Sequence, residues 1–305
     1  MEINLFHIEP KLTKLSKSIF SLEKPLQKLF EENLETLLGV RFLRSEYKTT
    51  DGQRMDTLGI DENNSPVIIE YKRTRNVSAI IQAVSYLAWL KEHRGDFEVL
   101  VSGKFGKDIA NEIEWNTPRL ICVAADFSKS EKNAAKLLAQ EMSGSIELVR
   151  YCKFGDNSLL LELSTKVSKR SSSTLVSAPT TNTTKRRQIT VSESLEKASP
   201  KLKDLYKVAE NFIVNLGDDI NKEVLQHYFA FRRIRNFVCV EIKPRSKKIL
   251  LYLKIDPGSL QLEDGFTRDV RDKGIFGTGD LEVTLKSNDD LERAKELIQK
   301  SYEES

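Results

Sequence analysis

Apolar residues in the first third of the chain recur every three to four positions in two long segments. The first pattern predicts a helix over Leu22–Leu38, which Ser21 would cap and Gly39 would end. The second pattern predicts a helix over Val77–Trp89 with one apolar stripe. Both helices are amphipathic, so each is expected to cover a sheet rather than to lie free in solvent.

Strand patterns alternate with these helices. Met55–Ile60 and Val67–Tyr71 are apolar runs joined by turn residues, which predicts a β-hairpin. More elements of both kinds follow: strands at Glu98–Val101, Arg119–Ala124 and Ile146–Cys152, and helices at Lys107–Trp115 and Ser130–Met142. The alternation predicts an α/β domain built around a mixed sheet flanked by helices.

A change in composition divides the chain. Ten of the 22 residues at 166–187 are Ser or Thr, six are Lys or Arg, and none is acidic. Such a segment predicts a flexible, basic linker over 166–194, between a domain at 1–165 and a second one at 195–305. The second domain is predicted to be a smaller α+β unit with these elements: helices at Lys201–Leu216 and Asp289–Tyr302, and strands at Phe237–Lys243, Ile249–Ile255 and Leu281–Lys286.

The composition narrows the class of protein. The 305 residues are 39% hydrophobic and 30% charged, which is typical of a globular protein. No apolar run approaches the ~18–20 residues that span a bilayer, and the first ten residues lack a signal-peptide pattern, so we expect a cytoplasmic protein with no membrane partner. The three cysteines and three histidines lack the spacing of a disulfide framework or a zinc site. A net charge of +3 permits nucleic-acid binding without demonstrating it.

Charged residues converge at the end of the predicted hairpin. Glu70 and Lys72 are two positions apart on one strand, so they lie on the same face. A symmetric hairpin places Asp56 opposite Tyr71, give or take one residue, and therefore near both. Two close carboxylates repel, and a divalent cation such as Mg²⁺ or Mn²⁺ is their natural partner. The lysine can orient or deprotonate a water molecule, or offset charge on a phosphate.

Taken alone, a glutamate and a lysine on one strand more often form a surface ion pair. The following helix adds Gln82 and Tyr86, whose spacing of four places both on one stripe, separate from the apolar one. The combination is what favours a catalytic site over a solvated hairpin end.

The motifs Asp56, Glu70-Tyr71-Lys72 and Gln82-x-x-x-Tyr86 resemble those of the PD-(D/E)xK nuclease superfamily, in particular its RecB/NucS-like branch. The acidic residue that this branch carries on an upstream helix matches Glu23, in Glu23-Lys24-Pro25-Leu26-Gln27. The resemblance covers about residues 20–125, and Met55 stands where the superfamily's name has proline. Four other acidic residues are alternatives for the upstream position: Glu31, Glu32, Glu35 and Glu46.

The resemblance implies a restriction-endonuclease-like fold and divalent-metal-dependent hydrolysis of phosphodiester bonds, in DNA more than RNA, in defence or DNA repair. Asp56 and Glu70 would bind Mg²⁺ (or Mn²⁺), with Glu23 assisting. Lys72 would position the attacking water. Gln82 and Tyr86 would contact the substrate phosphate or brace Lys72.

Residues 195–305 are similar to an uncharacterised module that is catalogued as a predicted transport protein, although no segment is membrane-like. We expect a recognition or regulatory role for this module. Its partner stays open, and so does the question whether the protein forms a homodimer. Two alternatives to a nuclease also stay open: a catalytically silent nucleic-acid-binding module of the same fold, and a structural or interaction protein.

Overall fold

The computed structural model describes residues 3–72, 77–142, 144–168 and 189–305. The chain divides into two compact units, Met1–Arg170 and Ser171–Ser305. Residues 169–188 of the predicted linker lie outside the described residues. The described residues at its two ends belong to β9 (Ser158–Ser168) and α7 (Val191–Glu196).

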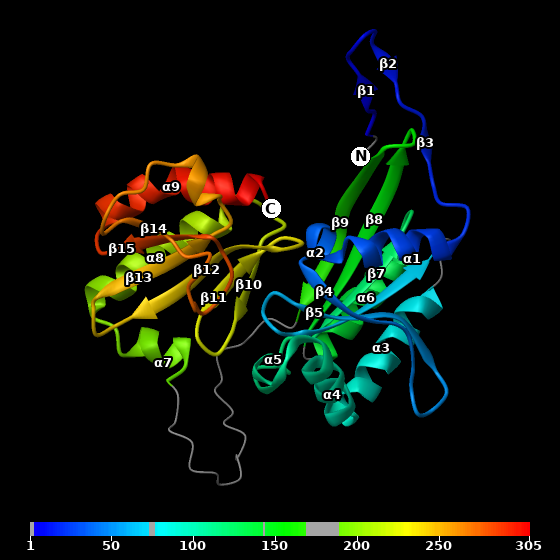
Figure 1. Cartoon of the computed structure of the whole chain (residues 1–305), viewed down its shortest axis with the longest axis horizontal. Coiled ribbons are helices and arrows are strands. Elements are labelled where there is room, and N and C mark those ends of the chain that lie inside the picture. Colours follow the sequence, from blue (N-terminus) through cyan, green and yellow to red (C-terminus); the bar gives the residue numbers. More distant parts are fainter. Residues whose placement is uncertain (1–2, 73–76, 143, 169–188) are drawn as a thin grey trace. The chain divides into compact units, whose positions relative to one another are not determined.

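The first unit is built on a seven-stranded mixed sheet (Figure 1). Its order is β3-β8-β7-β6-β5-β4, and β9 also pairs with β8. The strands β6, β7 and β8 are parallel to one another, and the other pairs are antiparallel. The predicted mixed sheet is therefore confirmed. The remaining strands of this sheet are β3 (Lys17–Ser18), β4 (Val40–Lys48), β5 (Arg54–Asp61), β6 (Pro66–Lys72), β7 (Arg119–Ala124) and β8 (Ser145–Phe154).

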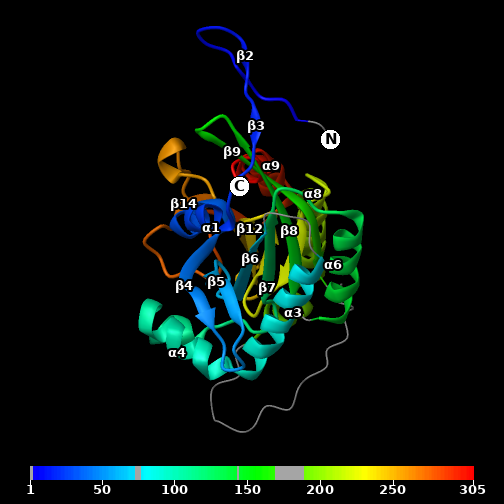
Figure 2. The same cartoon turned by 90° about the vertical axis from the view of Figure 1, so that its right-hand side faces the viewer.

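Helices cover both faces of this sheet. Side chains of α3 and α6 pack with Ile68 and Cys122 in one apolar core. The ring of Phe30 on α1 contacts Tyr71, which points to the opposite face because side chains alternate along β6. Figure 2 shows α1 and α3 on the two sides of the strands. The helices are α1 (Glu23–Glu32), α2 (Leu34–Leu38), α3 (Val77–Glu92), α4 (Arg94–Phe105), α5 (Lys107–Asn111) and α6 (Lys129–Glu141).

The single helix predicted over Leu22–Leu38 is wrong, because the chain forms α1 and α2 with a break at Asn33. The predicted cap is also wrong: Leu22 occupies the N-cap and makes no side-chain cap hydrogen bond. The predicted end at Gly39 is confirmed, since this residue has the left-handed backbone (φ 64°) that glycine adopts without strain.

The strand predicted over Glu98–Val101 is wrong, because these residues lie within helix α4. Phe97 and Val101, one helical turn apart, are buried, whereas Val99 between them is 72% exposed. The apolar run therefore follows the helical period, not strand alternation. The helix predicted over Lys107–Trp115 is also shorter and ends at Asn111.

Residues 3–22 form an arm that the sequence patterns do not predict. Its hairpin pairs β1 (Phe6–His7) with β2 (Thr13–Lys14), and β3 then joins the main sheet beside β8. Figure 1 shows the hairpin extending beyond the sheet. The arm also carries exposed apolar side chains, including Ile8 and Leu12.

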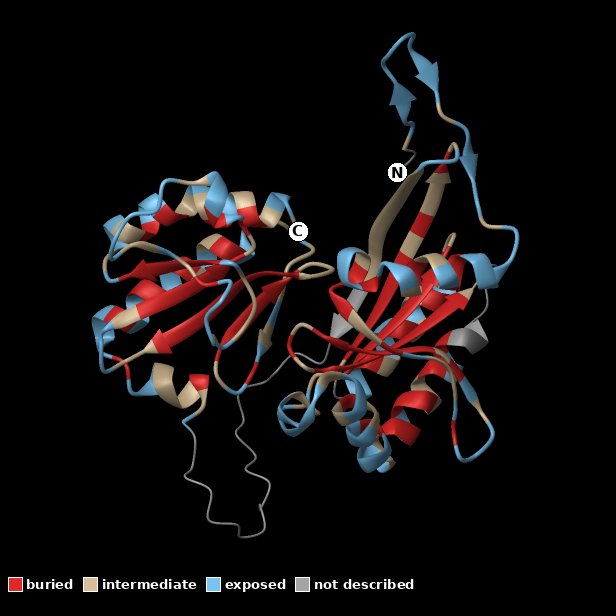
Figure 3. Ribbon diagram, in the orientation of Figure 1, coloured by how far each residue is buried: buried red, intermediate tan, exposed pale blue. Residues whose placement is uncertain are grey.

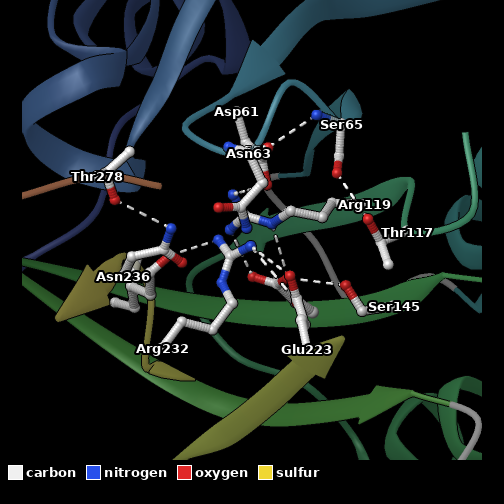
Figure 4. Close-up of polar contacts among 12 residues, drawn as sticks. Asp61, Asn63, Ser65, Thr117, Arg119, Ser145, Glu223, Arg232, Asn236 and Thr278 are labelled. Carbon is white, nitrogen blue, oxygen red and sulfur yellow. Dashed lines mark hydrogen bonds and ion pairs between the residues drawn. The ribbon is translucent and has the colours of Figure 1, made fainter. Parts of the chain in front are cut away.

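A buried charged cluster lies at the edge of the sheet where β7 begins. Arg119 donates hydrogen bonds from Nε and Nη2 to the two carboxylate oxygens of Glu147, each at 2.9 Å. Its Nη1 lies 3.5 Å from Oδ2 of Asp61, at the end of β5 (Figure 4). Because Arg119 is in register with Val67 at the start of β6, this cluster is at the edge opposite Lys72.

The second unit is an α+β fold, as predicted, with a six-stranded antiparallel sheet in the order β10-β11-β12-β13-β15-β14. Its helices pack on one face to form an apolar core, and Figure 3 shows the buried strands beside helices with exposed outer faces. Its strands are β10 (Asn221–Val224), β11 (Phe229–Arg232), β12 (Asn236–Lys243), β13 (Lys248–Leu253), β14 (Thr267–Asp269) and β15 (Leu281–Leu285). Besides α7, its helices are α8 (Pro200–Val214), the short 3₁₀ helix η1 (Pro257–Ser259) and α9 (Asn288–Glu303).

Candidate metal and catalytic site

The β5–β6 hairpin brings two carboxyl groups together. Thr57 pairs with Ile69, so the next position in register places Asp56 beside Glu70, one residue from the predicted partner. The Asp56 N–H donates to Glu70 Oε1 at 3.2 Å, and the Tyr71 N–H donates to Asp56 Oδ2 at 3.1 Å. Each carboxyl group is therefore held by the backbone of the opposite strand.

The electrostatics of this pair are unusual. The side chain of Glu70 is 1% exposed, and its Oε1 accepts the hydrogen bond from the Asp56 N–H. Burial, followed by the charge of Asp56, raises the pKa of Glu70 to about 8. Burial also raises the pKa of Asp56, against the hydrogen bond from the Tyr71 N–H. Two buried carboxyl groups in this state favour a shared proton or a cation between them.

Lys72 completes the predicted trio. Its Nζ lies 3.5 Å from Glu70 Oε2, and its side chain is 22% exposed. One lysine offsets part of the charge of two carboxylates and remains within reach of solvent. The structure thus brings together Asp56, Glu70 and Lys72.

Gln82 and Tyr86 lie on α3 as predicted, and Gln82 Nε2 donates to the Tyr86 hydroxyl at 2.5 Å. The expected separation from the apolar stripe is wrong for Tyr86, which is fully buried in the core that α3 shares with the sheet. Its hydroxyl donates to the carbonyl of Arg54 at 2.7 Å, two residues before Asp56. Tyr86 therefore anchors β5, while the exposed Gln82 is the member of the pair that can reach a substrate.

Glu23 is the first residue of α1 and is exposed. Its negative charge adds to the effect of burial in raising the pKa of Asp56. Among the described residues, no three His, Cys, Asp or Glu side chains are arranged to hold a metal ion. The assignment of Glu23 as a third metal ligand stays a prediction, while Asp56 and Glu70 are the two predicted ligands that the backbone hydrogen bonds hold together.

Two of the alternatives to Glu23 have other partners. Glu46 pairs with Lys24 at 2.5 Å and with Arg54 at 3.0 Å. Glu31 accepts hydrogen bonds from Gln27 and Thr57.

Three residues support the site in a way that the sequence analysis did not predict, although it named Gln27 within the upstream motif and Glu31 as an alternative to Glu23. The buried Gln27 donates from Nε2 to the carbonyl of Asp56 at 2.9 Å and to Glu31 Oε1 at 2.9 Å. Glu31 Oε1 also accepts the hydroxyl of Thr57 at 2.6 Å. The signal was the spacing of four between Glu23, Gln27 and Glu31, which puts a polar row on one face of the helix.

The donor set fits a hard divalent cation. Oxygen ligands suit Mg²⁺ and Mn²⁺, and Asp56 and Glu70 present carboxylate oxygens on one face of the sheet edge. The raised pKa of Glu70 means that a positive charge at this position is favourable. Asp56 and Glu70 are therefore the residues that could hold the ion.

Comparisons with known proteins agree with a nuclease-like first unit. The endonuclease NucS C-terminal domain matches residues 22–114, and a domain of unknown function (DUF5655) matches residues 191–305. This second domain has no known function, so the similarity to a predicted transport protein is not confirmed. Among the described residues, no helix is both long and apolar enough to cross a bilayer.

Solved structures of repair endonucleases are similar to part of the chain. The crystal structure of a repair endonuclease from Pyrococcus abyssi is 19% identical over 44% of this chain and 49% of its own, with a TM-score of 0.29. An EndoMS–dsDNA complex is 20% identical over 48% of this chain and 59% of its own, with a TM-score of 0.28. The chain thus spans about half the length of these proteins. The fold described above rests on the structure of this chain alone and not on these two similarities.

An uncharacterized protein from Haemophilus influenzae is 30% identical to this chain. The alignment covers 96% of this chain and 97% of the relative, so it spans both units. The chain therefore belongs to the same family as the Haemophilus influenzae protein.

Proposed function

We propose that the first unit is a divalent-metal-dependent nuclease that hydrolyses phosphodiester bonds in nucleic acid, with DNA preferred over RNA. The observation that carries the proposal is the adjacent pair of Asp56 and Glu70, whose carboxylates accept hydrogen bonds from backbone N–H groups, with Lys72 Nζ 3.5 Å from the buried Glu70. The match of residues 22–114 to an endonuclease domain supports the reaction class. The preference for DNA rests on the resemblance to NucS-like nucleases.

Each residue has a role that its position allows. Asp56 and Glu70 would hold Mg²⁺ or Mn²⁺, which supplies charge neutralisation at the phosphate and acidifies a bound water. Lys72, partly exposed beside Glu70, orients the attacking water and offsets the charge that builds on the phosphate oxygens. Gln82 is exposed one turn from Tyr86 and donates to a phosphate oxygen. Glu23 attracts the cation through its charge at the rim.

The test is cleavage of single-stranded, double-stranded and flap DNA, and of RNA, by the full chain with Mg²⁺, Mn²⁺ or EDTA. We expect metal-dependent cleavage, and a loss of about 10²-fold or more in Asp56→Asn, Glu70→Gln and Lys72→Ala. Matched controls are Glu32→Gln and Lys136→Ala, which remove the same charges from exposed helix positions. These controls should cleave like the wild type.

Two outcomes contradict the proposal. Nucleic-acid binding with no metal-dependent cleavage of any substrate would favour the catalytically silent binding module. Equal cleavage by the wild type and by Glu70→Gln would assign the activity to a contaminant or to another site. Calorimetric titration with Mn²⁺ tests the other alternative, a structural or interaction protein. Such a protein would show no metal affinity that depends on Asp56 and Glu70.

A further inference from the structure

One end of the sheet in the second unit collects positive charge. The chain from Lys243 to Leu253, which forms the end of β12, the turn 244–247 and β13, contains four lysines or arginines and no acidic residue. Residues 189–305 as a whole contain 20 lysines and arginines against 21 aspartates and glutamates. The unit is therefore close to neutral, whereas this end of its sheet is strongly basic.

The register of the sheet brings three of the cations side by side. Lys243 pairs directly with Lys248 across β12 and β13. Ile249 pairs with Leu285, so Lys286, the residue after β15, comes next to Lys248. Neighbouring strands lie about 4.8 Å apart. Like charges on adjacent strands repel each other, so this row destabilises the sheet unless an anion lies beside it.

The turn between β12 and β13 adds two exposed cations, Arg245 and Lys247. The N–H of Lys247 donates to the carbonyl of Pro244 at 3.2 Å and closes the turn. Lys247 has a left-handed backbone (φ 51°), which glycine or asparagine adopts more readily than lysine does. A lysine at this position therefore does not favour the turn, which points to a role for its charge.

Together these cations form a patch that we call the basic tip: Lys243, Arg245, Lys247, Lys248 and Lys286. Ile242 and Ile249 pack in the core under the helices, so Lys243 and Lys248 point to the opposite face of the sheet. Lys243 pairs with Glu241 on its own strand. The other four cations form no ion pair with any residue that the structure describes. The basic tip thus carries an excess of positive charge.

We propose that the basic tip binds the phosphate backbone of the nucleic acid that the first unit cuts. One strand of a duplex carries a phosphate about every 3.4 Å along the helix axis, so lysines about 5 Å apart can contact separate phosphates of one strand. Such contacts hold and orient a protein on nucleic acid without reading its base sequence. This inference rests on the proposed function, and it assigns to the second unit a sequence-independent hold on the substrate.

The chemistry of the basic tip favours nucleic acid over two other anionic partners. Surfaces that bind membranes combine cations with apolar side chains that enter the lipid, and the turn 244–247 has no apolar side chain besides Pro244. Protein interfaces are enriched in aromatic residues and depleted in lysine, whereas the basic tip holds four lysines and no aromatic residue. Phosphate backbones, in contrast, are bound by lysine and arginine through charge alone.

The first experiment measures the affinity of the full chain for a short labelled DNA duplex, by fluorescence anisotropy in EDTA at several salt concentrations. Lys248→Gln and Lys286→Gln should each weaken binding about fivefold and reduce the salt slope of the affinity by about one. Lys203→Gln and Lys207→Gln are matched controls, because these exposed lysines lie on α8, which packs on the other face of the sheet. Single-stranded DNA and RNA of equal length show which backbone binds best.

The second experiment separates binding from a structural role of the turn. Lys247→Asn removes the charge but suits the left-handed backbone, so the melting temperature should stay at the wild-type value or rise while DNA affinity falls about fivefold. A lysine that serves the turn would give the reverse, a lower melting temperature with wild-type affinity. Arg245→Lys keeps the charge and should bind DNA like the wild type. Differential scanning fluorimetry of every variant identifies any loss of folding.

The outcomes separate this inference from the proposed function. Variants of the basic tip that bind every nucleic acid as tightly as the α8 controls overturn the inference even if the wild type cleaves DNA. Weaker binding with a smaller salt slope supports it even if no substrate is cut. Failure of the full chain to bind any nucleic acid at low salt overturns it, and so does displacement of DNA by phosphatidylserine vesicles or polyglutamate more readily than by unlabelled DNA.

Discussion

At the scale of single residues, the site depends on one energetic conflict. Glu70 is buried beside Asp56, and Lys72 is the cation within 4 Å of its carboxylate among the described residues. Burying an ionised carboxylate is costly unless it is paired, and a second carboxylate increases the cost. The ionised form of Glu70 is therefore unfavourable in the folded protein, and a bound cation would stabilise it.

This conflict predicts how stability depends on pH without metal. The pKa of Glu70 rises from 4.5 to about 8 on folding, so the folded state holds a proton that the unfolded chain has lost. The stabilisation is fully present below pH 4.5 and disappears as the pH rises through 8. In EDTA, the melting temperature should therefore fall between pH 5 and 8.5. Glu70→Gln should flatten this dependence; an equal slope in both proteins would contradict the prediction.

Mn²⁺ should reverse the same effect. A cation at the pair favours the ionised carboxylates, so adding it at pH 8 should raise the melting temperature of the wild type. Glu70→Gln should show a much smaller increase. Differential scanning fluorimetry with and without the ion measures this, and Glu32→Gln is the control because that residue is exposed on α1.

Gln27 should support the site from the other face of the sheet. Gln27→Leu removes the donor to the Asp56 carbonyl and leaves Glu31 with one fewer partner. We expect a loss of about 1–3 kcal/mol in the free energy of unfolding, together with weaker Mn²⁺ binding. Gln140→Leu makes the same change at an exposed position of α6 and should be nearly neutral. Wild-type metal affinity in Gln27→Leu would restrict Gln27 to a structural role.

At the scale of elements, local patterns predicted the part of the site that a single hairpin builds. Asp56, Glu70 and Lys72 came from strand alternation and a short turn, which involve neighbours in sequence. The contacts that Gln27 and Glu31 on α1 make with β5 were not predicted, because they depend on where the helix packs, and propensity does not specify packing. The pairing of β3 with β8 could not be predicted either, since it joins residues 17–18 to residues 153–154, far away in the sequence.

Helix α4 shows why one element was assigned to the wrong class. Short apolar runs fit both a buried strand and a buried helix, and Glu98–Val101 contains too few residues to separate the two periods. The observed burial of Val101 and exposure of Val99 fits only the helix.

A pair of substitutions tests that assignment. Val101→Lys buries an unpaired charge and should cost several kcal/mol of stability, whereas Val99→Lys should stay within about 0.5 kcal/mol. Urea denaturation of both proteins measures the difference. In a strand, the two side chains would share a face, and similar losses for both would contradict helix α4.

At the scale of the whole molecule, each unit has an apolar core of its own among the described residues. In the part of the chain that the structure describes, the core around α3 and α6 is made of residues of the first unit, and the core around α8 and α9 of residues of the second. Tyr71 and Lys72, which contact the carboxyl pair, also belong to the first unit.

Separate chains of residues 1–168 and 189–305 should therefore each fold. We expect both to show a cooperative thermal transition by circular dichroism, because each keeps its own core. The fragment 1–168 should retain metal-dependent cleavage, with the same relative loss on Glu70→Gln as in the full chain. A fragment that folds but cuts no substrate that the full chain cuts would assign part of the substrate binding to the second unit. A fragment that does not fold would show that the two cores are not independent.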